Sequence, residues 1–203
     1  MSIKPLSQQF IPFTTEHLTL VLGWRNSARV RVNMHDDKFI TWHEHQVWFE
    51  ALQVDKSRQY WIYCQNQRPI GVLNFSDINT DIGQWGCYLG ETDVLPGSGL
   101  VLEWAALEHM STVMSCSVLE AQVLSFNLPA IKLHTLFGYE AFKTEQGGWR
   151  FSPGSDDFLP YDVLHFRYIT ATWRDNRLKV LSRLPKPMQN VMQHIQFLAK
   201  DNL

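Results

Sequence analysis

The spacing of apolar and polar positions predicts two helices near the start of the chain. The segment 14–27 ("TTEHLTLVLGWRNS") repeats apolar residues at helical spacing and begins with threonines, which are favoured N-cap residues. The segment 41–52 begins with Thr41 and places Glu44 three residues later, which is the spacing of a capping box. The expected apolar faces are Leu18, Val21, Leu22 and Trp24 in the first helix, and Val47, Trp48 and Leu52 in the second.

The middle of the chain changes to a strand pattern. Residues 59–64, 70–78 and 82–90 are rich in apolar and aromatic residues and are separated by the turn sequences "QNQRP" and "NTD". They predict three successive antiparallel strands. A helix over about 99–114 and a strand over 118–125 are expected to follow.

The next helix has clear local signals at both ends. Asn127 is a plausible N-cap, Pro129 suits the first turn, and Gly138 is placed as a C-cap glycine. A strand is expected to begin at Ala141, and the last strand is expected over 161–173. The polar sequence between these two strands predicts a loop or an irregular hairpin.

The last expected strand ends at residue 173. We therefore divide the chain into a domain of residues 1–173 and an extension of residues 174–203. After two prolines the extension reads as an amphipathic helix. It can pack on the domain, form a homodimer or bind another partner, and the sequence leaves these alternatives open.

Composition excludes several classes of protein. The 203 residues are 45% hydrophobic and 19% charged, which is typical of a globular domain, and the net charge of −2 argues against a nucleic-acid partner. Cys64, Cys87 and Cys116 are far apart, so neither a disulfide framework nor a thiolate metal site is expected. With no secretory signal and no apolar run near the ~18 residues of a membrane span, we expect a cytoplasmic protein that does not bind a membrane.

A glycine-rich turn precedes the helix expected at 99–114. In "LPGSGLV" two glycines remove side chains where free backbone N–H groups and the positive end of a helix dipole favour an anion. The residues that could hold a phosphate or pyrophosphate are Gly97, Ser98, Gly99, Leu100 and Val101. The alternative is a purely structural helix cap, because the lysine of a phosphate-binding P-loop and the full GxGxxG pattern are both missing.

The order of these elements resembles the GNAT family of acetyl-CoA-dependent N-acetyltransferases over roughly residues 10–170. The glycine spacing of "LPGSGLV" fits the pyrophosphate loop of that family. The sequence "NLPAIKLHTLFGYEAF" fits its second motif, N-x-x-A-x-x-L-Y-x-x-x-G-F, at Asn127, Ala130, Leu133, Gly138 and Tyr139. The chain departs from the family at Pro96, Val101 and His134, the last of which replaces a tyrosine.

The resemblance implies an α/β (α+β) fold, with a central mixed, mostly antiparallel sheet flanked by helices. It implies acetyl-CoA as co-substrate, no metal and direct attack by an amine. The cofactor would lie along Cys87, Tyr88 and Leu89, which would also supply the oxyanion donor, and on the glycine turn. Asn127 would contact the cofactor, cap its helix, or do both. His134 would be the acid that protonates the CoA thiolate, unless it is a neutral filler and water supplies that proton.

A narrower resemblance within the family covers the N-terminal half, around "LGWRNSARVRVNMHDD". It points to acetylation of the 4-amino group of a UDP-linked amino-dideoxy sugar, on the route to pseudaminic acid and flagellin glycosylation. The implied substrate-binding residues are Trp24, Arg25, Asn26, Met34 and His45, and Arg31 adds a cation for a diphosphate. The alternatives are that Trp24 is a core aromatic, that the arginines are solvated, and that His45 is packed.

No general base is evident from the sequence. Gln84 stands where many relatives carry a glutamate, and Asp77, Glu91 and Asp93 are expected to be solvated loop carboxylates. A sugar amine can lose its proton to water. Two other functions therefore stay open: acetylation of a different amine, such as a protein N-terminus, and binding of acyl-CoA without catalysis.

Overall fold

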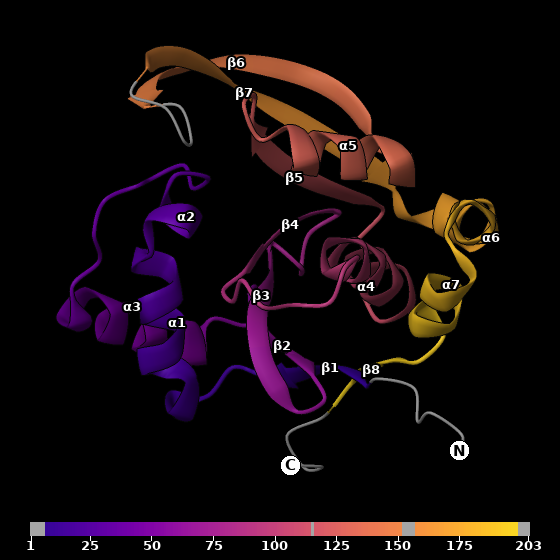
Figure 1. Ribbon diagram of the computed structural model, residues 1–203, viewed down its shortest axis with the longest axis horizontal. Coiled ribbons are helices and arrows are strands. Elements are labelled where there is room, and N and C mark those ends of the chain that lie inside the picture. Colours follow the sequence, from indigo (N-terminus) through magenta and orange to yellow (C-terminus); the bar gives the residue numbers. More distant parts are fainter. Residues whose placement is uncertain (1–6, 115, 152–156, 199–203) are drawn as a thin grey trace.

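The computed structural model describes residues 7–114, 116–151 and 157–198 of the chain. In this part of the chain eight strands form one sheet in the order β6-β7-β5-β4-β3-β2-β1-β8, with helices on both faces (Figure 1). The strands are β1 (Gln8–Pro12), β2 (Gln59–Gln65), β3 (Arg68–Ser76), β4 (Ile82–Leu89), β5 (Val118–Leu124), β6 (Glu140–Phe151), β7 (Phe158–Ile169) and β8 (Ile195–Phe197). Only the pairs β4–β5 and β1–β8 are parallel, so the expected mixed, mostly antiparallel sheet is confirmed.

The helices alternate with these strands along the chain. They are η1 (Thr15–His17), α1 (Leu18–Asn26), α2 (Ala28–Arg31), α3 (Trp42–Val54), α4 (Ser98–Thr112), α5 (Leu128–Phe137), η2 (Thr170–Thr172), α6 (Trp173–Arg183) and α7 (Lys186–Met192). The local signals at helix ends are confirmed. The Thr41 hydroxyl accepts the Glu44 N–H, while the Glu44 carboxylate accepts the Thr41 N–H at 2.7 Å. Gly138 ends α5 at a φ of +91°.

The face that α3 buries differs from the expected one. Val47 is 51% exposed, and the buried positions are His45 and Phe49. Trp48 and Leu52 are half-buried and pack beside them. The expected buried face was wrong at Val47. The residues at spacing i, i+3, i+4 and i+7 that form the buried face begin with a histidine, His45, which an apolar pattern does not count.

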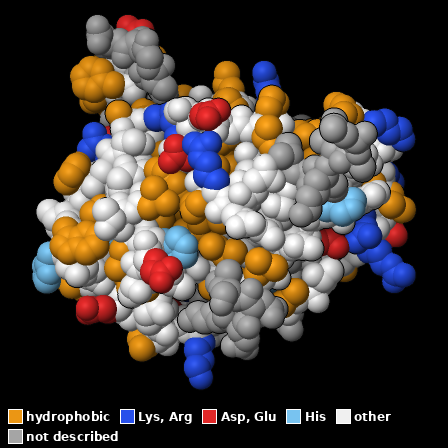
Figure 2. Space-filling model, turned by 60° about the horizontal axis from the view of Figure 1, so that its bottom comes forward, with side chains coloured by type: hydrophobic (Ala, Val, Ile, Leu, Met, Phe, Trp, Pro, Cys, Tyr) orange, Lys and Arg blue, Asp and Glu red, His pale blue; other side chains and the backbone are white. Residues whose placement is uncertain are grey.

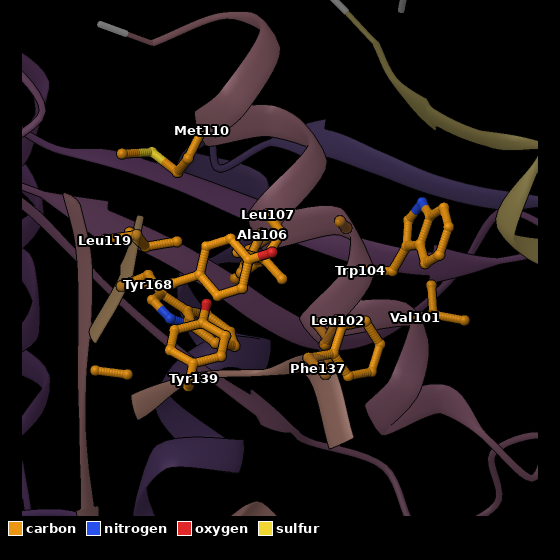
Figure 3. Packing of buried hydrophobic residues seen from close by; sticks show 14 of the residues in the cluster. Val101, Leu102, Trp104, Ala106, Leu107, Met110, Leu119, Phe137, Tyr139 and Tyr168 are labelled. Carbon is orange, nitrogen blue, oxygen red and sulfur yellow. The ribbon is translucent and has the colours of Figure 1, made fainter. Parts of the chain in front are cut away.

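Helix α4 lies in the centre of the larger core. Leu102, Leu107 and Met110 are nearly inaccessible and pack with Phe137 and Tyr168 (Figure 3). A helix that is apolar nearly all round is expected to be buried on every side, and α4 is covered by the sheet, α5 and α6. A second cluster, with Phe13, Trp24 and Phe49, lies under α1 and α3.

The segment 144–160 was expected to be a loop or an irregular hairpin. Its residues 144–151 and 158–160 belong to a long hairpin, β6–β7, with register shifts between Ala141 and Lys143 and between Gln146 and Gly148. This hairpin arches away from the other strands toward α2 (Figure 1). The predicted last strand was wrong at its end, since β7 stops at Ile169 and the chain turns into η2 and α6.

The extension beyond residue 173 contains more than the expected helix. After α6 and α7 the strand β8 pairs in parallel with β1, and Phe197 stacks on Phe10 with ring centroids 4.7 Å apart. These residues therefore pack on the sheet. The division of the chain at residue 173 stays a prediction, and residues 199–203 lie outside the described residues.

The outer surface carries charges of both signs, interspersed over the face that Figure 2 shows. No helix in the described part of the chain is both long and apolar enough to cross a bilayer.

Candidate functional site

A cavity of about 1060 Å³ runs through the protein between the two halves of the sheet. Its walls come from the helices and loops of residues 21–48 at one end, from β4 and β5 in the middle, and from the first turns of α4 and α5 at the other end. Small-molecule sites usually measure about 300–1,000 Å³. This cavity therefore lies just above the upper end of that range.

The cavity exists because β4 and β5 separate. They pair only from Ile82–Val118 to Gln84–Glu120. Beyond that point the segments 85–89 and 121–124 diverge, and both line the cavity. Cys87, Tyr88 and Leu89 therefore lie where a cofactor placed between the strands would meet them.

The thiol of Cys87 is open to the cavity, although protein atoms surround it closely. This enclosure, with the Glu103 carboxylate nearby, raises the pKa of Cys87 well above its usual range. Burial likewise raises the pKa of Tyr88. Both groups stay protonated at neutral pH, so Cys87 is placed as a neutral wall residue.

The glycine turn shapes the start of α4. Gly97 has a φ of +89°, which favours glycine, and a Cβ there would lie 2.8 Å from the Met188 sulfur in α7. Gly99 is on the cavity wall. The N–H groups of Gly99 and Leu100 have no acceptor among the described residues. These two donors are therefore free to bind an anion.

The other residues of the turn have structural contacts. The Ser98 hydroxyl donates to the Leu95 carbonyl and accepts from the Gln65 amide, both at 2.7 Å, and the Ser98 side chain is buried. The Val101 N–H donates to the Gly97 carbonyl. The side chains of Ser98, Leu100 and Val101 lie off the cavity wall, so the turn can contact a ligand only through its backbone.

Asn127 combines the two expected arrangements. Its side-chain oxygen accepts the Ala130 N–H at 3.4 Å and caps α5. The residue also lines the cavity, and its amide nitrogen has no partner among the described residues. The cap therefore leaves a donor free for a ligand.

His134 lies on the cavity wall, where it contacts Glu103, a residue that the sequence did not single out. Its Nδ1 is 2.6 Å from Oε1 of Glu103 in α4, and both side chains are buried. Burial raises the pKa of Glu103, while His134 opposes that rise. A buried carboxylate is costly unless it is paired, and His134 supplies the partner. The only sequence signal for Glu103 is a single acid inside the apolar run "LVLEWAAL".

Three of the residues expected to bind the acceptor line the far end of the cavity: Arg25, Met34 and His45. Arg29 and Lys38 join them there. Nη2 of Arg25 donates to the Asp36 carbonyl at 2.6 Å, which orients the guanidinium. This end of the cavity thus carries three cationic side chains beside two acidic residues, Asp36 and Glu44.

His45 is packed, and the residue also lines the cavity. Its ring stacks on Trp48 at 5.1 Å, and burial lowers its pKa, so it is neutral at pH 7. Its Nε2 is buried without a hydrogen-bond partner among the described residues. A buried unpaired polar atom on a cavity wall is where a ligand group would be expected.

Trp24, Asn26 and Arg31 lie off the cavity wall. Trp24 is 6% exposed in the second core and donates its indole N–H to Glu91 at 2.8 Å, which favours the core alternative. The Asn26 amide makes two hydrogen bonds with the backbone of Ile40 and so holds the loop that follows α2.

Arg150 was also missed, because it lies in the segment that was expected to be a loop or an irregular hairpin, where no site residue was sought. From the β6–β7 hairpin its guanidinium donates to the carbonyls of Val32, Met34 and His35 at 3.0, 2.6 and 3.0 Å. Its Nε lies 3.4 Å from the Asp37 carboxylate. Arg150 therefore fastens the loop that carries Met34.

The carboxylates considered as bases are occupied elsewhere or lie off the cavity. Glu91 binds Trp24 and forms an ion pair with Arg68 at 3.3 Å, and Asp93 also pairs with Arg68. Asp77 lies in a turn at a φ of +56°. Gln84 does line the cavity, but an amide cannot accept a proton in catalysis.

Known proteins resemble this chain in both sequence and fold, although no family model matches it. Acetyltransferase PseH from two strains of Campylobacter jejuni is 27% identical over 127 residues, which is 63% of this chain and 79% of the relative. A spermidine N-acetyltransferase from Vibrio cholerae, solved in complex with CoA and spermine, has a TM-score of 0.71 at 13% identity and covers 84% of this chain and 98% of its own. The crystal structure of Campylobacter jejuni PseH has a TM-score of 0.57 at 19% identity, over 82% of this chain and 99% of its own.

The splayed strands, the glycine turn and these likenesses define the class of protein: the chain has the GNAT fold and is an acetyltransferase. Within that class it resembles PseH. The expected fold and type of enzyme are confirmed. The role of each site residue stays a prediction.

Proposed function

We propose that the chain transfers the acetyl group of acetyl-CoA to the 4-amino group of a UDP-linked amino-dideoxy sugar. Such a product would feed pseudaminic acid synthesis and flagellin glycosylation. The observation that carries the proposal is one continuous cavity, with a backbone anion site near α4 and three cations near α1 and α2. The similarity to PseH supports the choice of acceptor.

Acetyl-CoA fits the end of the cavity near α4. The N–H groups of Gly99 and Leu100 would bind its pyrophosphate, and the amide nitrogen of Asn127, which lines the same cavity, would assist. The pantetheine arm would lie between β4 and β5, where the strands leave backbone groups unpaired. The thioester would then lie beside Cys87 and His134.

The sugar nucleotide would occupy the opposite end. Arg25, Arg29 and Lys38 would neutralise the diphosphate, since guanidinium groups bind phosphate oxygens in a fork. His45 would offer its free Nε2 to a hydroxyl or a carbonyl of the substrate. Phe39, which is 65% exposed, provides an aromatic surface on which a uracil ring can stack.

Acetyl transfer in this arrangement depends on placement more than on strong acids or bases. A neutral amine attacks the thioester carbonyl, and holding the two substrates together can supply ~7–11 kcal/mol of the barrier. A backbone N–H of the segment 87–89 would stabilise the oxyanion. His134 would protonate the CoA thiolate as the C–S bond breaks.

The experiment compares acceptors at a fixed concentration of acetyl-CoA, with release of the CoA thiol as the readout. A UDP-4-amino-4,6-dideoxy-N-acetylhexosamine should be turned over, and spermidine and an N-terminal peptide should not. UDP alone should bind by calorimetry and inhibit. Turnover of spermidine or of the peptide, together with no binding of UDP, would contradict the proposal. Acetyl-CoA binding without turnover of any amine would favour the non-catalytic alternative.

A further inference from the structure

A buried acid–imidazole pair lies where the thioester would be. Glu103 comes from α4, one helical turn beyond the glycine turn, and His134 comes from α5. Their side chains are 3% and 6% exposed, and both residues line the cavity. The 2.6 Å contact joins Nδ1 of His134 to the carboxyl of Glu103, so the pair shares one proton, which lies on Nδ1 when Glu103 is a carboxylate. The other ring nitrogen, Nε2, has no protein partner among the described residues.

The surroundings of the pair limit which groups can move a proton there. His134 is enclosed by the rings of Trp85, Tyr139 and Phe166 at 5.6, 4.8 and 5.0 Å. Trp85 and Phe166 do not titrate. Burial raises the pKa values of Tyr139 and Cys87 well above neutral, so both stay protonated at pH 7. Among these residues His134 has a ring nitrogen, Nε2, that can both accept and return a proton.

We propose that Glu103 and His134 form a proton-shuttle pair, in which Glu103 is a positioning residue that fixes the tautomer and orientation of His134. This inference rests on acetyl transfer occurring in this cavity. It assigns a base as well as an acid to the reaction, and both roles fall on the same ring nitrogen. The same relation between a carboxylate and an imidazole operates in hydrolase triads.

The proton balance of the step is closed. The neutral amine forms a bond to the thioester carbonyl carbon and becomes a cationic nitrogen in the tetrahedral intermediate. Nε2 of His134 takes one proton from that nitrogen, and Glu103 stabilises the imidazolium. As the carbonyl re-forms and the C–S bond breaks, Nε2 returns the proton to sulfur. The products are the acetamide and the CoA thiol, and His134 is neutral again.

Two features of the chain agree with this assignment. Gln84 lines the cavity from β4, but an amide cannot accept the amine proton, so a protein base has to come from another residue. The tyrosine of the second GNAT motif is replaced by His134, and a phenol could not accept the amine proton at neutral pH. In the proposed pair the buried Glu103 accepts from Nδ1 of His134 and leaves Nε2 free for the proton transfer.

The kinetic test uses Glu103→Gln, His134→Gln and the double variant, with Glu108→Gln as matched control. Glu108 lies on the same helix, where it accepts from Trp173 and pairs with Arg177. We expect Glu103→Gln to lower kcat by ~10–100-fold with little change in either KM, and His134→Gln to lower it by ~10²–10³-fold. The double variant should be no slower than His134→Gln, because the two residues act as a unit. Glu108→Gln should match the wild type.

The pH dependence of kcat supplies a second readout. The base must be neutral at the start of the step, so kcat should fall on the acid side. In Glu103→Gln the imidazolium loses its carboxylate, so this acid limb should move to lower pH. Multiplicative losses in the double variant, or an unmoved acid limb, would overturn the proposal.

A spectroscopic test separates this inference from the choice of acceptor. In the wild-type protein, ¹⁵N NMR of the histidine rings should show His134 protonated at Nδ1, and Glu103→Gln should broaden or shift that signal. A His134 ring protonated at Nε2 alone would overturn the pairing without reference to any substrate. If the UDP-sugar is inert but another amine is turned over, the proposed acceptor is wrong. The same variants, assayed with that other amine, then test the proton-shuttle pair independently of the acceptor.

Discussion

Arg150 offers a sharp test of how the acceptor end of the cavity is built. Its side chain is 9% exposed and makes three hydrogen bonds to backbone carbonyls of residues 32–35, besides its contact with Asp37. Hydrogen bonds from a charged donor contribute ~1.5–3 kcal/mol each. Arg150→Ala removes all three. The net cost to binding is smaller than their sum, because water solvates the released carbonyls and Asn26 still holds the loop at Ile40.

We therefore expect Arg150→Ala to weaken acceptor binding by ~1.4–2.8 kcal/mol, which is a 10–100-fold rise in the acceptor KM. The KM for acetyl-CoA should stay unchanged. Arg150→Lys keeps the charge but not the forked donors of the guanidinium, so its acceptor KM should lie between those of the wild type and Arg150→Ala. The assay is steady-state release of the CoA thiol with the acceptor varied at saturating acetyl-CoA.

The matched control is Arg167→Ala on β7. Arg167 is a more exposed arginine that pairs with Glu140 at 3.6 Å, far along the hairpin from the loop that carries Met34. The Arg167→Ala variant should leave the acceptor KM unchanged. The reasoning is refuted if Arg150→Ala leaves the acceptor KM at the wild-type value, or raises the KM for acetyl-CoA equally.

Three further predictions concern stability. Gly97→Ala should destabilise the fold by ~1–2 kcal/mol in a urea titration, because the φ of +89° disfavours a side chain and Met188 lies in its way; an unchanged midpoint would contradict this. Hydrogen bonds from Thr41 lower the pKa of Glu44 below its ordinary 4.5, so its stabilising effect is present above pH 4.5 and is lost as the pH falls through the folded-state value. The gap in melting temperature between the wild type and Glu44→Ala should accordingly shrink in acid, and a gap that stays constant to pH 3 would argue against the capping box. Phe197→Ala should lower stability by ~2 kcal/mol in chemical denaturation by removing the ring that holds β8 on β1, whereas an effect below ~0.5 kcal/mol would mean that β8 contributes little.

Local chemistry explains which parts of the fold the sequence could predict. Thr41 with Glu44, and Asn127 with Gly138, mark helix ends through hydrogen bonds and backbone angles formed within a few residues. The three antiparallel strands before the glycine turn, β2, β3 and β4, are likewise predicted by short-range patterns. The strand β8 is only three residues long, so it carries no pattern and depends on its pairing with β1.

The residues of the candidate site likewise differ in whether the sequence could predict them. Cys87, Gly99 and His134, which the resemblance singled out, line the cavity from β4, α4 and α5. Residues that are adjacent in the sequence can nevertheless have side chains in different environments. Arg25 lies on the wall, while Trp24 packs into the core beside it.

The missed residues act across long separations in sequence. Glu103 meets His134 through the packing of α4 on α5, and Arg150 reaches residues 32–35 from the far end of the β6–β7 hairpin. Neither contact leaves a periodic or motif signal. A lone acid in an apolar helix was the one available hint, and burying it requires a partner that only the three-dimensional packing reveals.

The most direct test of the central claim is the structure of the product. The enzyme is incubated with acetyl-CoA and a UDP-4-amino-4,6-dideoxy-N-acetylhexosamine, and the product is analysed by two-dimensional NMR. The account predicts a new acetamide N–H coupled to H4 of the sugar, formed with one equivalent of free CoA. An unmodified sugar, recovered under conditions in which acetyl-CoA is bound or is consumed by another amine, would contradict it.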